Sequence, residues 1–227
     1  MSNAFYNNKR FRNSDTKTEF KERFRTTEAL IENLYLQAIV EAYGRIKLGK
    51  GVEKLKENDI RNLFIADFKY HNTLIKPYIE NKVITFTAEN QSYTQTLNQR
   101  TDIEFHSNLH QISFVIECKR LTSAETRYVQ GSIKNGQYEI DGLEKFIHLI
   151  YAEKDHVAAM LGFVISGNVQ NICKGLQAKA QAFKPSSQMS EFIDKKSIDW
   201  DYSFQSTHLR NNQRKLLLHH LFFDFSK

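Results

Sequence analysis

The sequence predicts an α/β fold in one domain, because two amphipathic helical patterns precede three consecutive strand patterns and further helices and strands follow. Its 227 residues suit a single well-packed domain. The chain has 17 Phe, 10 Tyr and 1 Trp but only 9 Gly and 2 Pro, so it carries large core side chains and little linker material. This composition excludes disordered, collagen-like and low-complexity chains.

Two helices are predicted in the first third of the domain. Over residues 27–48 apolar side chains recur every three or four positions, with Thr26 or Thr27 as the N-cap and the Gly-Lys-Gly segment at 49–51 as the end. A second helix over 58–70 carries its apolar residues on one side, and Pro77 marks the break after it.

The pattern then changes to strands. Residues 82–88, 100–106 and 111–119 alternate and are rich in β-branched residues, which predicts an antiparallel meander with a loop at 107–110. A helical stretch over 124–150, interrupted near Gly136 and Gly142, comes next. A strand over 160–166, a helix over 170–183 and strands over 202–209 and 216–225 complete the chain. The predicted order is α, α, β, β, β, α, β, α, β, β.

Residues 1–26 are predicted to form a basic N-terminal arm that precedes a single domain over 27–227. The first 25 residues hold seven basic and three acidic side chains, a net charge of +4 out of +6 for the chain. Aromatic residues stand among these charges, which suggests phosphate contacts and base stacking. A solvated surface segment is the alternative. The aromatic residues are Phe5, Tyr6, Phe11, Phe20 and Phe24.

Targeting signals are missing from the given sequence. No apolar stretch reaches the length of a membrane span, and the N-terminal residues contain no apolar signal segment. Cys118 and Cys173 do not have the spacing of a disulfide framework or a metal site. We therefore expect a cytoplasmic protein that has no membrane partner.

Acidic and basic side chains on two neighbouring strands form the strongest chemical pattern. If His106 faces Gln111 across the loop, Asp102 lies opposite Val115 and diagonal to Glu117, about 7–8 Å away at Cα. Two carboxylates suit Mg²⁺, whose shell is completed by waters and a phosphate. Lys119, on the same face as Glu117, can orient or deprotonate a water. The alternative is a surface ion pair that contributes less than about 1 kcal/mol.

The segments RTDIEF at 100–105 and ECKRL at 117–121 resemble the PD-(D/E)xK motif of the restriction-endonuclease-like nuclease superfamily, with Thr101 in place of proline. The resemblance covers about residues 53–166. It implies an αβββαβ core with a mixed central sheet flanked by helices, Mg²⁺ as cofactor with Mn²⁺ as a substitute, and DNA as substrate. It also implies that Asp102 and Glu117 bind the metal and that Lys119 assists the attacking water.

The same resemblance suggests an additional acid near the metal, on the helix before the first strand. Glu57 is the expected metal ligand, and Glu53 and Glu89 are its rivals. A helix-capping or solvent-facing acid is the alternative for Glu57.

Several further residues are predicted to contact nucleic acid. Residues 128–134 resemble a helix that lines the active site of some of these nucleases, which suggests phosphate contacts. A core tyrosine and a solvated surface lysine are the alternatives for Tyr128 and Lys134. Arg210, between the last two strands, and Arg61 are further candidates. The predicted nucleic-acid-binding residues are Tyr128, Gln130, Lys134, Arg61 and Arg210.

The pattern as a whole predicts a Mg²⁺-dependent DNA endonuclease. Glycine-rich phosphate loops, HExxH and GxSxG are absent, which excludes the common nucleotide-binding, zinc-protease and α/β-hydrolase classes. A role in restriction or anti-phage defence follows from the resemblance alone. Two alternatives remain: a catalytically silent nucleic-acid-binding or interaction module, and an RNA or structure-specific repair nuclease. The modest charge suggests a homodimer or a partner subunit for cutting both strands.

Overall fold

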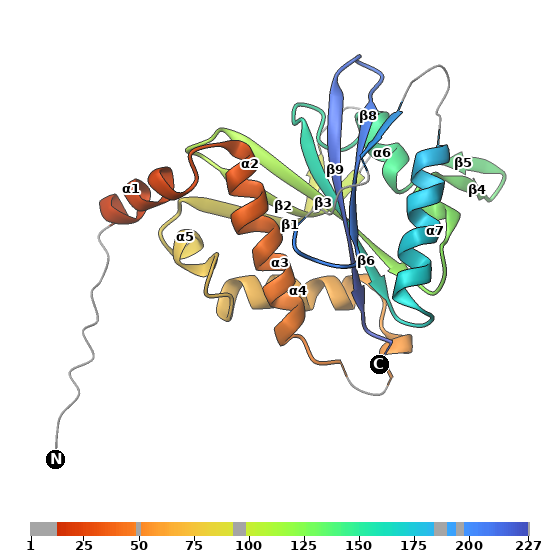
Figure 1. The fold of residues 1–227 in the computed structure, drawn as a ribbon, viewed down its shortest axis with the longest axis horizontal. Helices are drawn as coiled ribbons and strands as arrows, with labels where there is room; N and C mark the ends of the chain where they lie inside the picture. Colours follow the sequence, from red (N-terminus) through yellow and green to blue (C-terminus); the bar gives the residue numbers. More distant parts are fainter. Residues whose placement is uncertain (1–12, 49–50, 93–98, 184–189, 194–197, 227) are drawn as a thin grey trace.

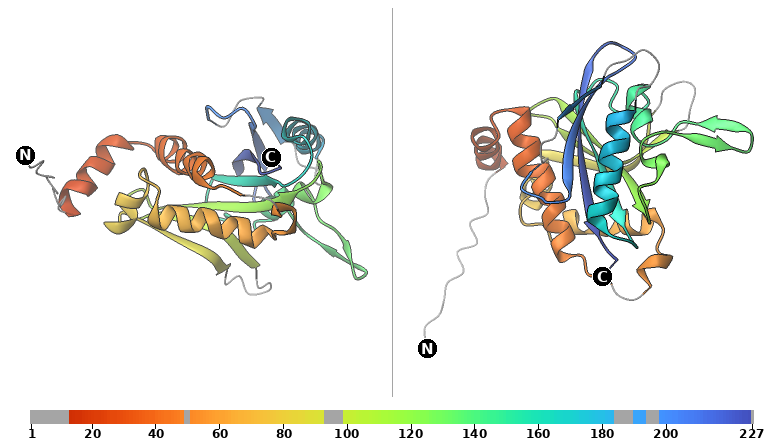
Figure 2. Two further views of the ribbon diagram at one scale, coloured as in Figure 1. Left: turned by 90° about the horizontal axis from the view of Figure 1, so that it is seen from below. Right: turned by 45° about the vertical axis from the view of Figure 1, so that its right-hand side comes forward.

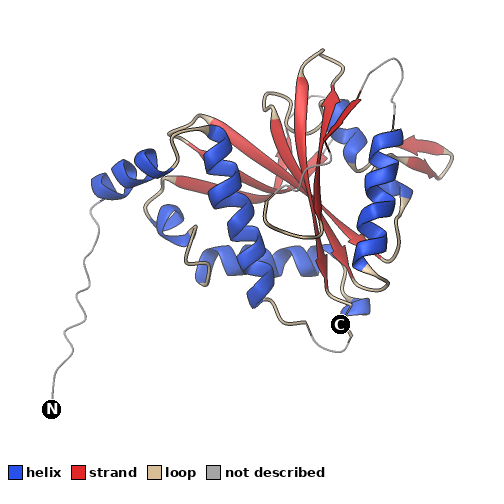
Figure 3. Cartoon of the chain, in the orientation of Figure 1, coloured by secondary structure: helices blue, strands red, loops and turns tan. Residues whose placement is uncertain are grey.

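The computed structural model describes residues 13–48, 51–92, 99–183, 190–193 and 198–226. A seven-stranded mixed sheet in the order β1-β2-β3-β6-β9-β8-β7 forms its centre. Helices cover both faces of this sheet (Figure 1; Figure 3). The predicted α/β class is confirmed. Phe5, Tyr6 and Phe11 of the predicted arm lie outside the described residues.

The three central strands of the sheet are parallel and the outer ones are antiparallel. β3 pairs with β6, and β6 with β9, in parallel registers. All eight residues of β6 are buried, as expected for a central strand covered on both faces. The strands are β1 (Ile84–Ser92), β2 (Gln99–Ser107), β3 (Ile112–Leu121), β6 (Val157–Val164), β7 (Ser190–Ile193), β8 (Ser203–Leu209) and β9 (Lys215–Asp224).

One helical layer comes from the N-terminal third of the chain. It contains α1 (Asn13–Arg23), α2 (Thr27–Leu30), a π-helical turn (Ile31–Tyr35), α3 (Leu36–Arg45), α4 (Glu57–Tyr70) and α5 (Lys76–Glu80). The Oγ1 atom of Thr26 accepts a hydrogen bond from the N–H of Ala29 and caps α2, which confirms the predicted helix start. The second layer holds α6 (Leu143–Ile147) and α7 (Val169–Ala182). No helix in the described residues is both long enough and apolar enough to span a bilayer.

The two faces of β3 pack into different cores. Ile116 and Cys118 pack against the N-terminal helices, whereas Val115 and Leu121 belong to the core beneath α6 and α7. Because side chains alternate along a strand, Glu117 and Lys119 share the face of Val115. The predicted division of this strand into an apolar face and a charged face is confirmed, although the charged face is itself partly buried.

Residues 13–26, the described part of the predicted arm, are part of the fold. Phe20 and Phe24 of α1 and its C-terminal flank are fully buried, with ring centroids 5.0 and 5.9 Å from that of Tyr78. Burial removes both rings from solvent, so they cannot stack on bases. This corrects the expectation for these two aromatic residues.

The helix predicted over 124–150 is largely replaced by a hairpin. A short 3-10 turn (Thr126–Tyr128) leads into β4 (Ser132–Lys134) and β5 (Gln137–Glu139), and only α6 is helical. Asn135 and Gly136 both have positive φ, of 52° and 79°, which is the geometry of a two-residue hairpin turn. Figure 2 shows this green hairpin projecting from the body of the molecule.

The β2–β3 turn lies one residue further along the chain than the predicted turn at 107–110. Ser107 pairs with Ile112, so the turn comprises residues 108–111. Gln111 has φ +52°, a left-handed conformation that belongs to the turn and not to a strand. As a result Val115 lies opposite Glu104 and not Asp102, which corrects the predicted register.

Candidate active site

The candidate active site lies where β2 separates from β3. The last paired residues of the two strands are Ile103 and Ile116. One residue beyond them, the Oδ2 atom of Asp102 accepts a hydrogen bond from the backbone N–H of Cys118 at 2.7 Å. At this point a hydrogen bond from the side chain of Asp102 takes the place of a backbone hydrogen bond between β2 and β3. Glu117, the residue that follows Ile116, is a neighbour of Asp102 across the strands and not its diagonal partner.

Asp102 is a largely buried acid whose pKa is raised. Burial is the main cause that raises its pKa to about 7, and the negative charges of Glu117 and Glu57 add to it, while the Cys118 N–H opposes them. Arg61 on α4 places Nη1 2.9 Å from Oδ1 of Asp102. Because Arg61 is only 3% exposed, it supports Asp102 from within the fold. This corrects its predicted contact with nucleic acid.

Lys119 is held between two carboxylates. Its Nζ atom lies 2.8 Å from Oε1 of Glu117 and 2.8 Å from Oδ1 of Asp141. Burial alone would lower the pKa of Lys119, but Glu117, Glu57 and Asp141 outweigh burial and raise it well above its usual value. Lys119 is therefore an ammonium that can donate hydrogen bonds to a water or a phosphate. It is not a free base in this arrangement.

Asp141 and Lys145 complete the charged cluster, and neither is among the residues predicted from the sequence. Asp141 precedes α6, where the N–H of Gly142 donates to its Oδ1 atom and Arg127 contacts its Oδ2 atom at 3.0 Å. Burial would raise the pKa of Asp141, but Lys119 and then Lys145 lower it to about 2. The Nζ atom of Lys145 on α6 lies 3.0 Å from Oε1 of Glu117. The spacing of four residues between Asp141 and Lys145 was the sequence signal that could have identified this pair.

Glu57 joins this cluster from the first turn of α4. Its Oε2 atom accepts a hydrogen bond from the backbone N–H of Arg120 at 2.9 Å. Burial raises the pKa of Glu57, Lys119 opposes this effect, and Glu117 contributes to it, so the three groups share one electrostatic environment. Of its rivals, Glu53 has an exposed side chain, and the side chain of Glu89 lies outside what the structure describes.

The donor chemistry of the cluster suits a divalent cation. Among the described residues, no three His, Cys, Asp or Glu side chains form a ready-made metal cluster. Mg²⁺ does not require one, because it commonly takes one or two carboxylates and completes its shell with water and phosphate oxygens. A cation bound by Asp102 and Glu117 would also relieve the repulsion that raises the pKa of Asp102. The residues fit such an ion.

A cavity of about 450 Å³ opens beside Lys119. Four of its lining side chains are cationic and two are carboxylates, so the net charge of the wall is positive. Such a wall attracts anions such as phosphate. The β4–β5 hairpin supplies four of the nine lining residues. The lining residues are Lys119, Arg127, Ser132, Ile133, Lys134, Glu139, Ile140, Asp141 and Lys145.

The other predicted nucleic-acid contacts divide into two groups. Tyr128 is buried with its OH 3.0 Å from Nδ1 of His220, and Arg210 is buried with Nη1 donating to the carbonyl of Ala152. Both are structural, which corrects the expectation that they contact phosphate. Gln130 is half-buried and the side chain of Lys134 is 65% exposed. Contacts by these two residues stay predictions.

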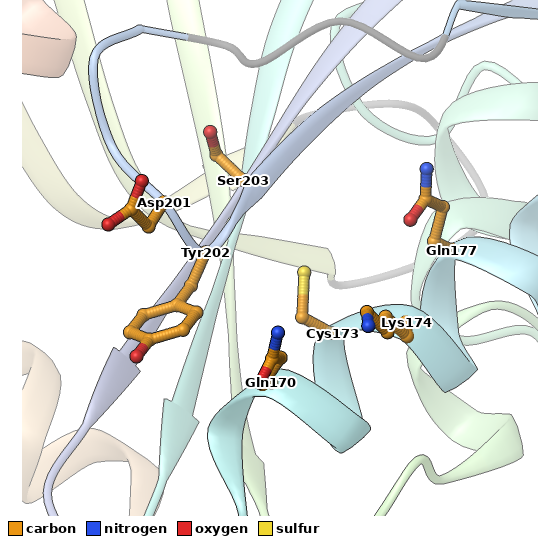
Figure 4. A pocket seen from close by; sticks show the side chains of 7 residues that line it. All are labelled: Gln170, Cys173, Lys174, Gln177, Asp201, Tyr202 and Ser203. Atoms are coloured by element: carbon orange, nitrogen blue, oxygen red, sulfur yellow. The ribbon is translucent and has the colours of Figure 1, made fainter.

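A second cavity, also of about 450 Å³, lies between α7 and the start of β8 (Figure 4). Cys173 lines it, and burial raises the pKa of this thiol to about 12, so it stays protonated and is a poor nucleophile. One lysine and one aspartate, Lys174 and Asp201, line this cavity, against four cations and two carboxylates in the first. Its lining residues are Gln170, Cys173, Lys174, Gln177, Asp201, Tyr202 and Ser203.

The first cavity and the cluster beside it therefore combine a net positive wall with two buried or partly buried carboxylates, Asp102 and Glu117, and the ammonium donor of Lys119. Comparisons with protein-family models, with curated proteins and with solved structures find no match for this chain.

Proposed function

We propose that this protein is a metal-dependent nuclease that hydrolyses phosphodiester bonds in DNA. The observation that carries the proposal is the convergence of Asp102, Glu117 and Lys119 where β2 separates from β3. Glu57 approaches the same point from α4. The order of these residues along the chain and the mixed sheet with helices on both faces agree with the resemblance to the PD-(D/E)xK superfamily.

Each side chain has a role in this proposal. Asp102 and Glu117 would hold the metal, which when bound would supply Lewis-acid polarisation of the phosphoryl group and lower the pKa of a water. Lys119 donates hydrogen bonds to the attacking water and offsets negative charge that develops on the phosphoryl oxygens. Asp141 fixes the position of Lys119. Lys145 and Arg127 attract the substrate phosphates into the cavity.

The direct test is the cleavage of supercoiled plasmid DNA by the purified protein with Mg²⁺ or Mn²⁺, and with EDTA instead. We expect metal-dependent nicking that Glu117→Gln and Lys119→Ala each reduce by about a hundredfold or more. The matched control is Lys154→Ala, which removes an exposed lysine outside the cluster and should leave the rate unchanged. Metal-dependent nicking that all three variants retain would mean that this cluster is not the active site.

The same assay identifies the substrate. Duplex DNA, forked DNA and RNA of matched sequence are compared at equal protein concentration. A clear preference for duplex DNA supports the DNA endonuclease, whereas a preference for forked DNA or RNA would assign the protein to repair or RNA cleavage.

A silent nucleic-acid-binding module is the second candidate, and one observation favours it. The carboxylates already have cationic partners within the chain: Arg61 for Asp102, and Lys119 with Lys145 for Glu117. The cluster is thus partly neutralised without a metal. Calorimetric titration with Mn²⁺ separates the two candidates. Mn²⁺ binding that Asp102→Asn weakens supports the nuclease. The silent module is supported if the wild type binds no metal and Asp102→Asn has the same DNA affinity as the wild type.

A further inference from the structure

The β4–β5 hairpin carries an unusual exposed apolar pair. Among the described residues, four large apolar side chains are exposed: Leu63, Tyr70, Ile133 and Tyr138. Two of these face each other across the hairpin, since Ile133 pairs with Tyr138. They are 77% and 55% exposed. Because directly opposite residues share one face of a ribbon, the two side chains form one apolar surface in water.

This surface adjoins the candidate active site. Ile133 and Lys134 line the same cavity as Lys119 and Lys145. The hairpin also projects beyond the helices and the sheet (Figure 2, right-hand view). A ligand that reaches Lys119 from solvent therefore passes the hairpin.

The hairpin is anchored firmly at its base. A two-stranded ribbon is marginally stable alone, so its position depends on what holds it. The buried carboxylate of Glu144 accepts hydrogen bonds at 2.8 Å from the N–H of Gly131 and from the OH of Tyr138. Gly131 packs so closely on the carbonyl of Glu139 that a Cβ atom there would collide with it. The hairpin is held in place before any ligand binds.

Cations flank the apolar pair. The side chains of Lys134 and Arg127 are each 65% exposed and lie on the wall of the same cavity. An apolar ribbon face beside exposed cations suits a duplex groove, because sugars and thymine methyl groups line the groove and phosphates form its edges. The major groove of B-DNA admits a two-stranded β-ribbon.

We propose that the β4–β5 hairpin is an arm that enters a groove of duplex DNA next to the bond that the protein cleaves. Ile133 contacts sugars and base edges, and Lys134 and Arg127 contact the flanking phosphates. This inference rests on the proposed nuclease function and narrows its substrate to duplex DNA, since a single strand has no groove for the ribbon.

The test is equilibrium binding by fluorescence anisotropy in EDTA, where cleavage does not interfere. A labelled duplex and one of its single strands are titrated with the wild-type protein, with Ile133→Ser and with Tyr70→Ser as matched control. Tyr70 is 63% exposed at the opposite end of α4 from Glu57. Substitution by serine changes no charge, so a loss of DNA affinity reports the loss of an apolar contact.

We expect Ile133→Ser to weaken duplex binding about fivefold to tenfold and single-strand binding less than about twofold, while Tyr70→Ser changes neither. Equal duplex affinity of all three proteins, with cleavage by the wild type intact, would overturn the arm and leave the nuclease standing. Equal losses on duplex and single strand would overturn the groove assignment. A wild type that neither binds nor cleaves nucleic acid would overturn both proposals and make a protein partner the candidate ligand of the hairpin.

Discussion

The ammonium group of Lys119 lies 2.8 Å from Oδ1 of Asp141, which follows it by 22 positions in the chain. Asp141 is itself held by the N–H of Gly142 and by Arg127. The position of Lys119 therefore depends on the loop before α6 as well as on its own strand. In the proposed mechanism Asp141 is a positioning residue, since it acts through Lys119.

Replacing Asp141 tests this dependence. Asp141→Asn keeps the shape of the side chain but removes one of the charges that raise the pKa of Lys119. We expect the single-turnover cleavage rate to fall about tenfold to a hundredfold, with little loss of DNA affinity. The alkaline limb of the pH–rate profile should move to lower pH, because Lys119 then loses its proton more readily.

The control for Asp141 is Glu139→Gln. Glu139 lines the same cavity but is half exposed, and it lies 3.6 Å from the nearest cation, Lys134. We expect its rate and pH profile to match the wild type. An unchanged alkaline limb in Asp141→Asn would contradict the positioning role, even if the rate fell.

The raised pKa of Asp102 predicts that metal binding depends on pH. Below about pH 7 this carboxyl is mostly protonated in the folded protein, and a proton competes with the metal. We expect the affinity for Mn²⁺ to fall about tenfold per pH unit below pH 7 and to level off above it. Calorimetry at a series of pH values measures this directly. Asp102→Asn should bind more weakly and lose the dependence, and a flat profile in the wild type would refute the assignment.

Periodicity was sufficient to predict much of the fold. The helix over 27–48 and β3 were found because their apolar spacing is unambiguous over many residues. Asp102, Glu117 and Lys119 were found because charged residues at alternate positions of an apolar strand are conspicuous. The register of β2 on β3 was predicted wrongly. It depends on the positive φ of Gln111, a residue with no special preference for that conformation.

Two predicted nucleic-acid contacts were wrong for the same physical reason: each side chain is buried against a partner that is distant in the sequence. Tyr128 was predicted to contact phosphate because residues 128–134 resemble an active-site helix, with a core tyrosine as the alternative, and Arg210 because it stands between the last two strands. Each is buried against a partner 92 or 58 positions away in the chain, which local sequence does not reveal. The hairpin is different, because the Asn135-Gly136 pair is a strong local turn signal that the helical composition of 124–150 obscured.

The loop that holds Asp141 tolerates no side chain at Gly142. This residue has φ +57°, and a Cβ atom there would collide with the carbonyl of Tyr128. We expect Gly142→Ala to lower the free energy of unfolding by about 2 kcal/mol or more in urea denaturation. Gly44→Ala is the control: it lies within α3 with no described atom within 4 Å of the added methyl group, and should stabilise by about 0.5–1 kcal/mol. Equal stability of Gly142→Ala and wild type would contradict this.

Two buried histidines predict how stability depends on acid. Burial lowers the pKa of His208 from 6.5 to about 4, and burial also lowers the pKa of His220. Both rings contact the hydroxyl of Ser206, at 2.8 and 2.7 Å. Between about pH 6.5 and pH 4 the unfolded chain therefore binds protons at these rings that the folded protein excludes. The two histidines therefore contribute a fall in the free energy of unfolding as the pH drops through this window, and this contribution is retained in full above pH 6.5; the raised pKa of Asp102 acts in the opposite direction.

The expected loss is about 1.4 kcal/mol per pH unit for each histidine, measured by urea denaturation at several pH values across the window. His208→Gln keeps a hydrogen-bonding group near Ser206 but cannot take up the proton. Its stability should therefore fall less steeply with acid, by about the contribution of one histidine. His71→Gln, which replaces an exposed ring, should keep the wild-type slope. If His208→Gln also kept that slope, the acid sensitivity would have to arise from groups other than His208.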